Sequence, residues 1–238
     1  MHHLKTIIKK ELRAYFNSPI AYIFITAYLI LTNWLFFRSF FLISQAEMRN
    51  YFSLLPFIFL FFLPAITMRL WAEEKKTNTL EILLTWPVRE WEVVLGKFCA
   101  ALLFLIIILA CSFTVPISIA LLGQPDLGVI LGNYVGTLFL GASYLAIGLY
   151  LSSLTKNQIV AFIIAVVVSF FFFIISEPFF LQSIPSFLQP LFQFVGLSGH
   201  FDSIARGVLD SRDIFYYLSV ISFFLFLNIR QVESRKWQ

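Results

Sequence analysis

Few residues of this chain could perform covalent chemistry. Residues 196–199 read G-L-S-G, a G-x-S-G motif in which Ser198 could act as the nucleophile of a membrane-embedded protease. Such a serine needs a histidine base that reaches it from a separate helix. The three histidines are His2 and His3, at the start of the chain, and His200, which is too near in sequence to reach the serine freely. We therefore expect residues 196–199 to form a turn before the last apolar segment.

Nucleotide and metal chemistry lack their usual motifs as well. The sequence has no G-x-x-x-x-G-K-[ST] phosphate loop, because Gly96-Lys97 lacks both the earlier glycine and the following hydroxyl residue. It has no H-E-x-x-H motif and no Cys/His metal spacing, and its two cysteines lie within one apolar run. We expect no catalytic, cofactor-binding or metal-binding residues, so any ATP hydrolysis must take place on another chain.

Composition indicates a membrane protein. The 238 residues are 60% hydrophobic and 13% charged, and they include 30 phenylalanines. A soluble domain carries about 25% charged residues, so most of this surface does not face water. The net charge of +4 arises mainly from Lys and Arg at the ends of apolar runs. This placement favours anionic lipid headgroups as the partner and argues against nucleic acid.

Apolar runs predict an all-α fold with six transmembrane helices. A helix needs roughly 20 apolar residues to cross a hydrocarbon core of about 30 Å. Pro185 and Pro190 cut a seventh apolar region, so we expect short interfacial or re-entrant helices over residues 177–199. The six predicted spans are Ile20–Phe37, Phe52–Leu70, Phe98–Leu122, Leu127–Leu151, Ile159–Ser176 and Ile214–Ile229.

Lys and Arg predict the orientation of these spans, because cytoplasmic loops carry an excess of both residues. If both termini are cytoplasmic, thirteen basic residues fall inside and four outside. The outer four are Arg38, Arg49, Arg206 and Arg212. The opposite orientation inverts this ratio, so we expect both termini in the cytoplasm.

The pattern of the first 17 residues predicts a helix separate from the transmembrane spans. Leu4, Ile7, Ile8, Leu12, Tyr15 and Phe16 recur at helical spacing, whereas Lys5, Lys9, Lys10 and Arg13 fall largely off that stripe. We expect residues 1–17 to form an amphipathic helix in the inner interface, followed by a six-span domain over residues 18–238. Either a simple anchor or an elbow with a mechanical role agrees with this pattern.

A charged, amphipathic segment between Trp71 and Lys97 interrupts the apolar runs. Leu80, Leu83 and Leu84 share a predicted helical face that ends at Pro87. A second short helix is predicted over Arg89–Leu95 and leads through Gly96-Lys97 into the third span. Trp71 suits the headgroup level. We interpret residues 71–97 as a cytoplasmic hairpin on which a partner docks, since a plain tether has no need of five acids and four bases.

This segment resembles the ABC-2 type membrane permease subunits of ATP-binding-cassette exporters. Their pattern E-x-x-x-G-T-x-E-x-L-L-x-x-P, followed by G-K at the next span, is matched from Glu74 to Pro87 and at Gly96-Lys97. Asn78 replaces the usual glycine, and asparagine tolerates a left-handed backbone better than other residues with side chains. The stretch from His200 to Trp237 is also similar to the gliding-motility-associated subgroup of permeases.

The resemblance implies a function and its partners. It implies a permease that converts the motion of a cytosolic ATP-binding-cassette ATPase, which carries the ATP and Mg, into opening of a translocation path. It also implies a dimer with a second permease, identical or paralogous, in a bacterial inner membrane. The alternative is a scaffold or force-transmitting component of a gliding or secretion assembly that translocates nothing.

Two sets of residues follow as candidate sites. The resemblance implies contact with the ATPase through the hairpin, and we favour an outer hydrophobic gate over passive interface packing for the phenylalanine-rich segment. The candidate coupling residues are Glu73, Glu74, Asn78, Thr79, Leu80, Glu81, Leu83, Leu84, Pro87 and Arg89. The candidate gate residues are Phe179, Phe180, Phe187 and Phe192. The G-x-x-x-G step at Gly132 and Gly136 favours packing within one subunit over a dimer contact.

Overall fold

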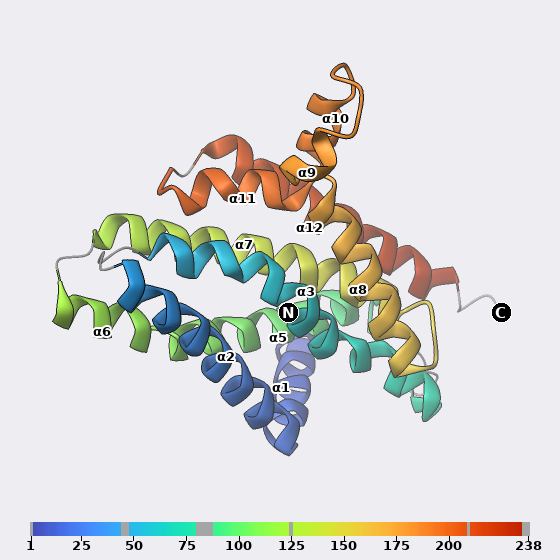
Figure 1. Ribbon diagram of the computed structural model, residues 1–238. Helices are drawn as coiled ribbons and strands as arrows, with labels where there is room; N and C mark the ends of the chain where they lie inside the picture. The colour runs from blue at the N-terminus through green and yellow to red at the C-terminus, as the bar shows by residue number, and fades with distance from the viewer. Residues whose placement is uncertain (1, 44–47, 80–87, 124–125, 209, 235–238) are drawn as a thin grey trace.

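The computed structural model of the protein describes residues 2–43, 48–79, 88–123, 126–208 and 210–234. Within these residues the regular elements are all helices, as predicted (Figure 1). They are α1 (His2–Phe16), α2 (Pro19–Ile43), α3 (Arg49–Lys76), α5 (Glu90–Cys111), α6 (Thr114–Leu122), α7 (Leu127–Ser152), α8 (Gln158–Ile174), α9 (Pro178–Leu181), α10 (Gln189–Val195), α11 (Leu197–Ala205) and α12 (Ser211–Ser234).

Six apolar segments occupy the positions of the predicted spans. Among the described residues, five are long and apolar enough to cross a membrane: α2, α3, the α5–α6 pair, α7 and α12. The sixth is α8, an apolar helix of 17 residues. At 1.5 Å per residue, α8 is roughly 26 Å long, which lies at the lower limit for a transmembrane helix.

Helices α3 and α7 form the centre of the bundle. Figure 1 shows them side by side, and α7 also contacts α8, α11 and α12. In the most apolar stretch of α7, 78% of the residues are buried, against 22% for α2. Glycine permits the close approach, because a Cβ atom on Gly148 would lie 2.2 Å from Thr67 Oγ1 on α3. Gly136 likewise faces Ile204 of α11, so its packing is within the subunit, as favoured from sequence.

The third predicted span ends at Leu122 as expected but differs from the expectation at its start and in its middle. Helix α5 begins at Glu90 and runs without a break through Gly96-Lys97, so the separate short helix predicted over Arg89–Leu95 is wrong. The backbone N–H of Arg89 donates to Glu92 Oε2 at 3.3 Å, which starts the helix, and Gly96 packs directly on Ile7 of α1. Ser112 and Phe113 then interrupt the span and separate α5 from α6.

The last connection contains more helix than predicted. The short helices expected between residues 177 and 199 are present as α9 and α10, and Figure 1 shows both projecting from the bundle. Residues 197–199, predicted as a turn, instead open helix α11, which lies against α3, α7 and α8. Asp210 begins the last span, because its carboxylate accepts a hydrogen bond from Arg212 N at 2.9 Å.

Candidate functional site

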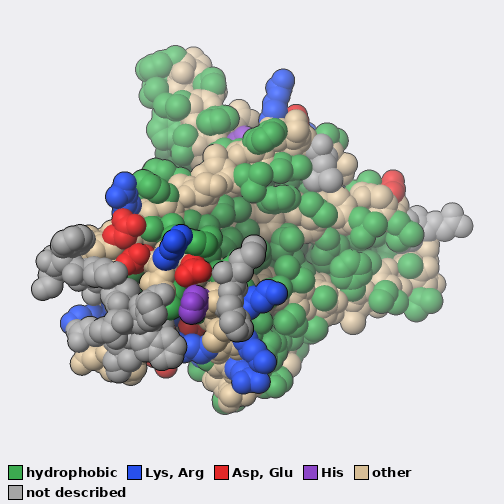
Figure 2. All heavy atoms as spheres, turned by 180° about the vertical axis from the view of Figure 1, so that it is seen from behind, with side chains coloured by type: hydrophobic (Ala, Val, Ile, Leu, Met, Phe, Trp, Pro, Cys, Tyr) green, Lys and Arg blue, Asp and Glu red, His purple; other side chains and the backbone are tan. Residues whose placement is uncertain are grey.

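The predicted hairpin lies between the end of α3 and the start of α5. Leu80, Glu81, Leu83, Leu84 and Pro87 fall outside the described residues, whereas Glu73, Glu74, Asn78, Thr79 and Arg89 are described. Lys, Arg, Asp and Glu gather at this end of the molecule, while hydrophobic side chains cover most of the rest of that face (Figure 2). We call the region of α1, the last turn of α3 and the first turns of α5 the α1 end.

Helix α3 ends in a polar turn that the sequence predicted. Asn78 has φ of 56°, the left-handed conformation expected from its place in the motif. The turn before it is closed by Thr77, whose backbone N–H and hydroxyl both donate to Glu73 O, at 3.0 and 2.9 Å. Thr79 Oγ1 lies 3.0 Å from Thr77 Oγ1. The chain therefore leaves α3 in a fixed direction toward the hairpin.

Lys97 is the centre of a buried ion-pair cluster. Its Nζ atom lies 3.0 Å from Glu11 Oε1 of α1 and 3.0 Å from Glu74 Oε2 of α3. It also donates a hydrogen bond to Leu70 O at 2.8 Å. Two of these contacts, those with Glu11 Oε1 and Leu70 O, are hydrogen bonds, whereas the contact with Glu74 Oε2 is an ion pair. The Lys97 side chain is 1% exposed, so its charge depends on these partners.

The cluster changes the assignment of two residues. Glu74 was expected to face the ATPase, but its carboxylate binds Lys97 and Lys10 inside the protein. Trp71, expected at the headgroup level, is fully buried, and Lys97 Nζ lies 5.0 Å from its ring centroid. Glu73 and Arg89 are exposed, so both can meet a partner.

Lys10 covers the solvent side of this cluster. Its Nζ atom lies 3.0 Å from Glu74 Oε1 and 3.7 Å from Glu11 Oε1, and its side chain is 59% exposed. Partial burial acts against its charge, but the two carboxylates outweigh that effect and raise the pKa of Lys10 above its usual value. Two carboxylates and two ammonium groups therefore balance within the cluster.

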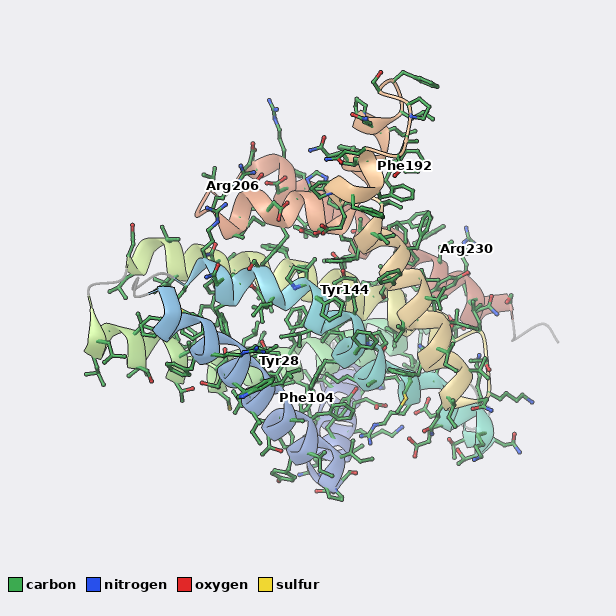
Figure 3. The ribbon with its side chains drawn as sticks, viewed as in Figure 1. Tyr28, Phe104, Tyr144, Phe192, Arg206 and Arg230 are labelled. Carbon is green, nitrogen blue, oxygen red and sulfur yellow. The ribbon has the colours of Figure 1, made fainter. Side chains whose placement is uncertain are left out.

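Helix α1 is packed into the bundle through its apolar stripe. Ile7 and Tyr15 are buried, whereas Lys5, Lys9, Lys10 and Arg13 are exposed, as the helical pattern predicted. The Tyr15 ring stacks on Phe104 of α5, which is labelled in Figure 3, with centroids 4.9 Å apart. The Tyr15 hydroxyl donates to Ile66 O at 3.2 Å. Arg69 donates to Ala14 O at 3.2 Å, which adds a second contact from α3. These contacts favour the elbow over a simple anchor.

A contact that the sequence reasoning missed fastens α3 to α7. Ser152 Oγ donates to Met68 O at 2.8 Å and accepts from Trp71 N at 3.2 Å. Lys75 donates to Ser153 O, one residue further along. The sequence feature that could have indicated this contact is the pair of adjacent serines at the end of an apolar span. Their spacing does not identify α3 as the partner. The base of the hairpin is thus joined to α1, α5 and α7.

The opposite end of the molecule holds the candidate gate residues. Phe179 and Phe187 are 83% and 77% exposed, while Phe180 and Phe192 are partly buried against each other with centroids 5.9 Å apart. Ser198 donates to Glu177 Oε1 at 2.8 Å, and His200 binds Asp213 at 2.6 Å. The serine and histidine therefore have separate partners and form no nucleophile–base pair.

Comparison with known proteins agrees with the resemblance carried by the hairpin. The sequence model of the family described as ABC-2 family transporter protein matches residues 5–229, from α1 to the last turns of α12. A search of curated proteins gave no match. The family match covers nearly the whole chain, including both ends described above. This chain therefore belongs to the ABC-2 family of transporter proteins.

Proposed function

We propose that this chain is the permease of an ATP-driven ABC-2 exporter and that a cytosolic ATPase docks on residues 71–97. The family makes the chain a permease component of an ABC transporter and implies an ATP-binding-cassette partner and a lipid bilayer. In this proposal the α1 end is cytoplasmic, in keeping with the excess of Lys and Arg there. A second permease subunit, identical or paralogous, completes the path across a bacterial inner membrane.

The observation that carries the proposal is the Lys97 cluster at the base of the hairpin. It joins Glu11 of α1 and Glu74 of α3 to α5 at ion-pair distances of 3.0 Å. A push transmitted to the base of the hairpin therefore acts on α1, α3 and α5 together. Packed helices that move as one body are a recurrent way to carry a shift from one site to another. Glu73, Asn78, Thr79 and Arg89, all exposed, supply polar contacts for the ATPase.

The predicted face of Leu80, Leu83 and Leu84 supplies the apolar part of the same contact. An amphipathic helix that lays such a face in a groove binds through residues spaced three or four apart. Glu81 lies on the same short segment and adds a charge. We assign to this face the largest share of the docking energy, because exposed charge pairs contribute little.

At the other end, we propose that α9 and α10 form the outer gate. Their phenylalanines lie on a projecting segment that begins directly after α8, a helix in contact with α3 and α7 (Figure 1). A cluster of aromatic side chains can exclude water without a fitted polar filter. The partly buried Phe180 and Phe192 are the pair on which closure depends most, and a double F180A/F192A variant is expected to raise solute leak across proteoliposomes.

The coupling proposal is tested by ATP turnover in nanodiscs. We expect the purified complex to contain an ATP-binding-cassette ATPase whose turnover the permease stimulates. The double variant E81A/L83A should insert and purify as the unchanged chain does but lose at least tenfold of that stimulation. Thr26→Val, at an exposed position of α2 outside residues 71–97, is the control and should keep the stimulation.

Two results contradict the proposal. One is unchanged stimulation in E81A/L83A, which places the ATPase elsewhere. The other is a complex that contains no ATPase, which favours the force-transmitting or scaffold alternative. A scaffold has no need to stimulate ATP turnover in its partner, so the same assay separates the two functions.

A further inference from the structure

A pocket of about 340 Å³, with polar and apolar lining in similar shares, lies between the projecting segment and helix α11. We call residues 178–195, which contain α9 and α10, the arm. One wall of the pocket is the arm, and the other is one face of α11, where lining residues recur at positions 199, 202, 203 and 206. Arg206, at the end of this face, is labelled in Figure 3. Its lining residues are Ser176, Pro178, Leu181, Gln182, Gln189, Gln193, Gly199, Asp202, Ser203 and Arg206.

The arm is amphipathic with respect to this pocket. Gln182, Gln189 and Gln193 line it. Phe179 and Phe187 are highly exposed and do not line it. A segment that served only as an apolar plug would have no reason to direct three carboxamides to one side. The distribution of these side chains therefore indicates a polar occupant between the arm and α11.

Hydrogen bonds hold the walls of the pocket in place. His200 of α11 contacts Phe194 O of α10 through Nε2 at 3.0 Å and Asp213 of α12 through Nδ1 at 2.6 Å. Gly199 N donates to Ser176 Oγ at 3.0 Å, which fixes the start of α11 against the end of α8. Gly196 permits this approach, since a Cβ atom there would lie 2.3 Å from Ser176 Cβ. A ligand therefore meets a preformed site, which lowers the entropic cost of binding.

The polar groups of the pocket carry no net charge. Asp202 and Arg206 are one helical turn apart, and Arg206 Nε donates to Asp202 O at 3.1 Å. Burial and the charge of Glu177 raise the pKa of Asp202, while Arg206 and Arg49 act in the opposite direction. The remaining polar side chains are three carboxamides and hydroxyl groups. A carboxamide donates and accepts hydrogen bonds from adjacent atoms, and a hydroxyl group does both from one oxygen.

We propose that this pocket binds a neutral, polyhydroxylated ligand, a sugar of one or two rings. Hydroxyl groups on a sugar ring both donate and accept hydrogen bonds, which matches the paired donors and acceptors of Gln182 and Gln193. Gln189 adds its carbonyl oxygen and one N–H, because its Nε2 already donates to Ile184 O at 3.2 Å. Pro178 and Leu181 offer an apolar surface for the C–H face of the ring. The pocket lies near the lower limit of the volume range of ligand sites, about 300–1,000 Å³, which fits a small ligand. The proposal goes beyond ATPase coupling and does not depend on it.

The ligand can come from two sources, a free saccharide or the headgroup of a glycolipid, and the test includes both. The full chain is placed in phosphatidylcholine nanodiscs prepared without sugar-based detergent. Saturation-transfer NMR then measures binding of free maltose, with trialanine as a probe of other chemistry. Inorganic phosphate, which has no carbon-bound protons, is the third probe and is followed by phosphorus-31 line broadening. A second set of nanodiscs contains a glucosyl diacylglycerol, which should compete with maltose if the lipid-linked sugar is the better occupant.

We expect the unchanged chain to bind maltose. The double variant Q182A/Q193A should bind it with about tenfold lower affinity, the loss expected for two or more hydrogen bonds. Both glutamines are exposed, so the variant should fold. Ser186→Ala, an exposed residue of the arm outside the pocket lining, is the matched control and should bind as the unchanged chain does. If the glycolipid competes with maltose, the ligand is the headgroup of a glycolipid. If it does not compete, the ligand is a free saccharide.

Three outcomes overturn the proposal. Binding of neither maltose nor the glycolipid means that the pocket takes no sugar. Equal maltose signals for Q182A/Q193A and the unchanged chain place the binding elsewhere. Saturation transfer to trialanine or tight phosphate binding without transfer to maltose assigns the pocket to a zwitterionic or anionic ligand.

Discussion

The two ends of this molecule are held together by different forces. At the α1 end, a buried ammonium group joins three elements through full charges, with Lys97 1% exposed. At the α11 end, neutral side chains and a histidine join α10, α11 and α12 through hydrogen bonds to backbone carbonyls and to single carboxylates, and an open pocket remains between the arm and α11. Breaking a buried ion pair leaves an uncompensated charge and is strongly destabilising, whereas a lost hydrogen bond costs less. The α1 end is therefore suited to moving as one body, and the α11 end to opening locally.

The largest expected effect comes from removing the cation of the α1 end. Lys97→Met leaves Glu11 and Glu74 close together, with only the largely exposed Lys10 as a shared counter-charge. We expect a loss of about 3–5 kcal/mol in the free energy of unfolding, measured by denaturant titration in detergent micelles. The triple variant K97M/E11Q/E74Q removes all three charges and should recover much of that loss. Unchanged stability of K97M would contradict the importance of the cluster.

A smaller and more local effect is expected at the α11 end. His200→Phe keeps a ring to pack on Tyr216, whose centroid lies 3.9 Å from that of His200, but removes the contacts with Asp213 and Phe194 O. We expect a cost of about 1–3 kcal/mol, seen mainly as faster amide hydrogen exchange in residues 189–195. A uniform increase across α3 and α7 instead would mean that the two ends are not distinct.

The stability of the turn at Asn78 should depend on how well the residue at this position tolerates a left-handed backbone. Asn78 has φ of 56°, and an alanine there costs about 1 kcal/mol more than a residue that tolerates the left-handed region. We expect Asn78→Ala to lower the thermal midpoint slightly and Asn78→Gly to leave it unchanged or raise it. If both variants behave alike, the conformation of this turn does not limit stability.

The smallest effect is expected at the exposed side of the Lys97 cluster. Lys10 is largely exposed, so Lys10→Met should cost about 0–1 kcal/mol. Because the folded-state pKa of Lys10 is raised, its contribution is fully present below the unfolded value of about 10.4 and is lost as pH rises through the folded value. The difference in stability between the unchanged chain and K10M should shrink above that pH. A difference that grows with pH would contradict the assigned ion pair.

Local patterns in the sequence predicted the helical elements well. The apolar stripe that includes Ile7 and Tyr15 is buried as expected, and the left-handed conformation at Asn78 followed from its place in the motif. Helix breaks were less predictable. The sequence suggested a separate helix over Arg89–Leu95, but capping at Arg89 and the packing of Gly96 on Ile7 make α5 continuous there. A glycine is compatible with a continuous helix and with a helix break, so the sequence around Gly96 does not distinguish the two. The contact with Ile7 of α1 favours the continuous helix.

The candidate site could be predicted in part. Glu73 and Arg89 are exposed where a partner can reach them, as expected, whereas Glu74 faces inward to Lys97. Glu73 and Glu74 are adjacent and chemically equal, so no local property separates them. Their difference arises from the direction in which the last turn of α3 presents each side chain to α1 and α5.

By itself, the sequence determined that this chain is an all-α membrane protein of the ABC-2 type, because apolar length, helical periodicity and a short motif are properties of neighbouring residues. Tertiary structure decided which distant residues meet. Glu11 and Lys97 are 86 positions apart, and their ion pair exists because α1 packs against α5. The pocket between the arm and α11 has the same origin. Contacts between distant segments depend on how whole helices pack, and side-chain shape and burial settle that packing in three dimensions.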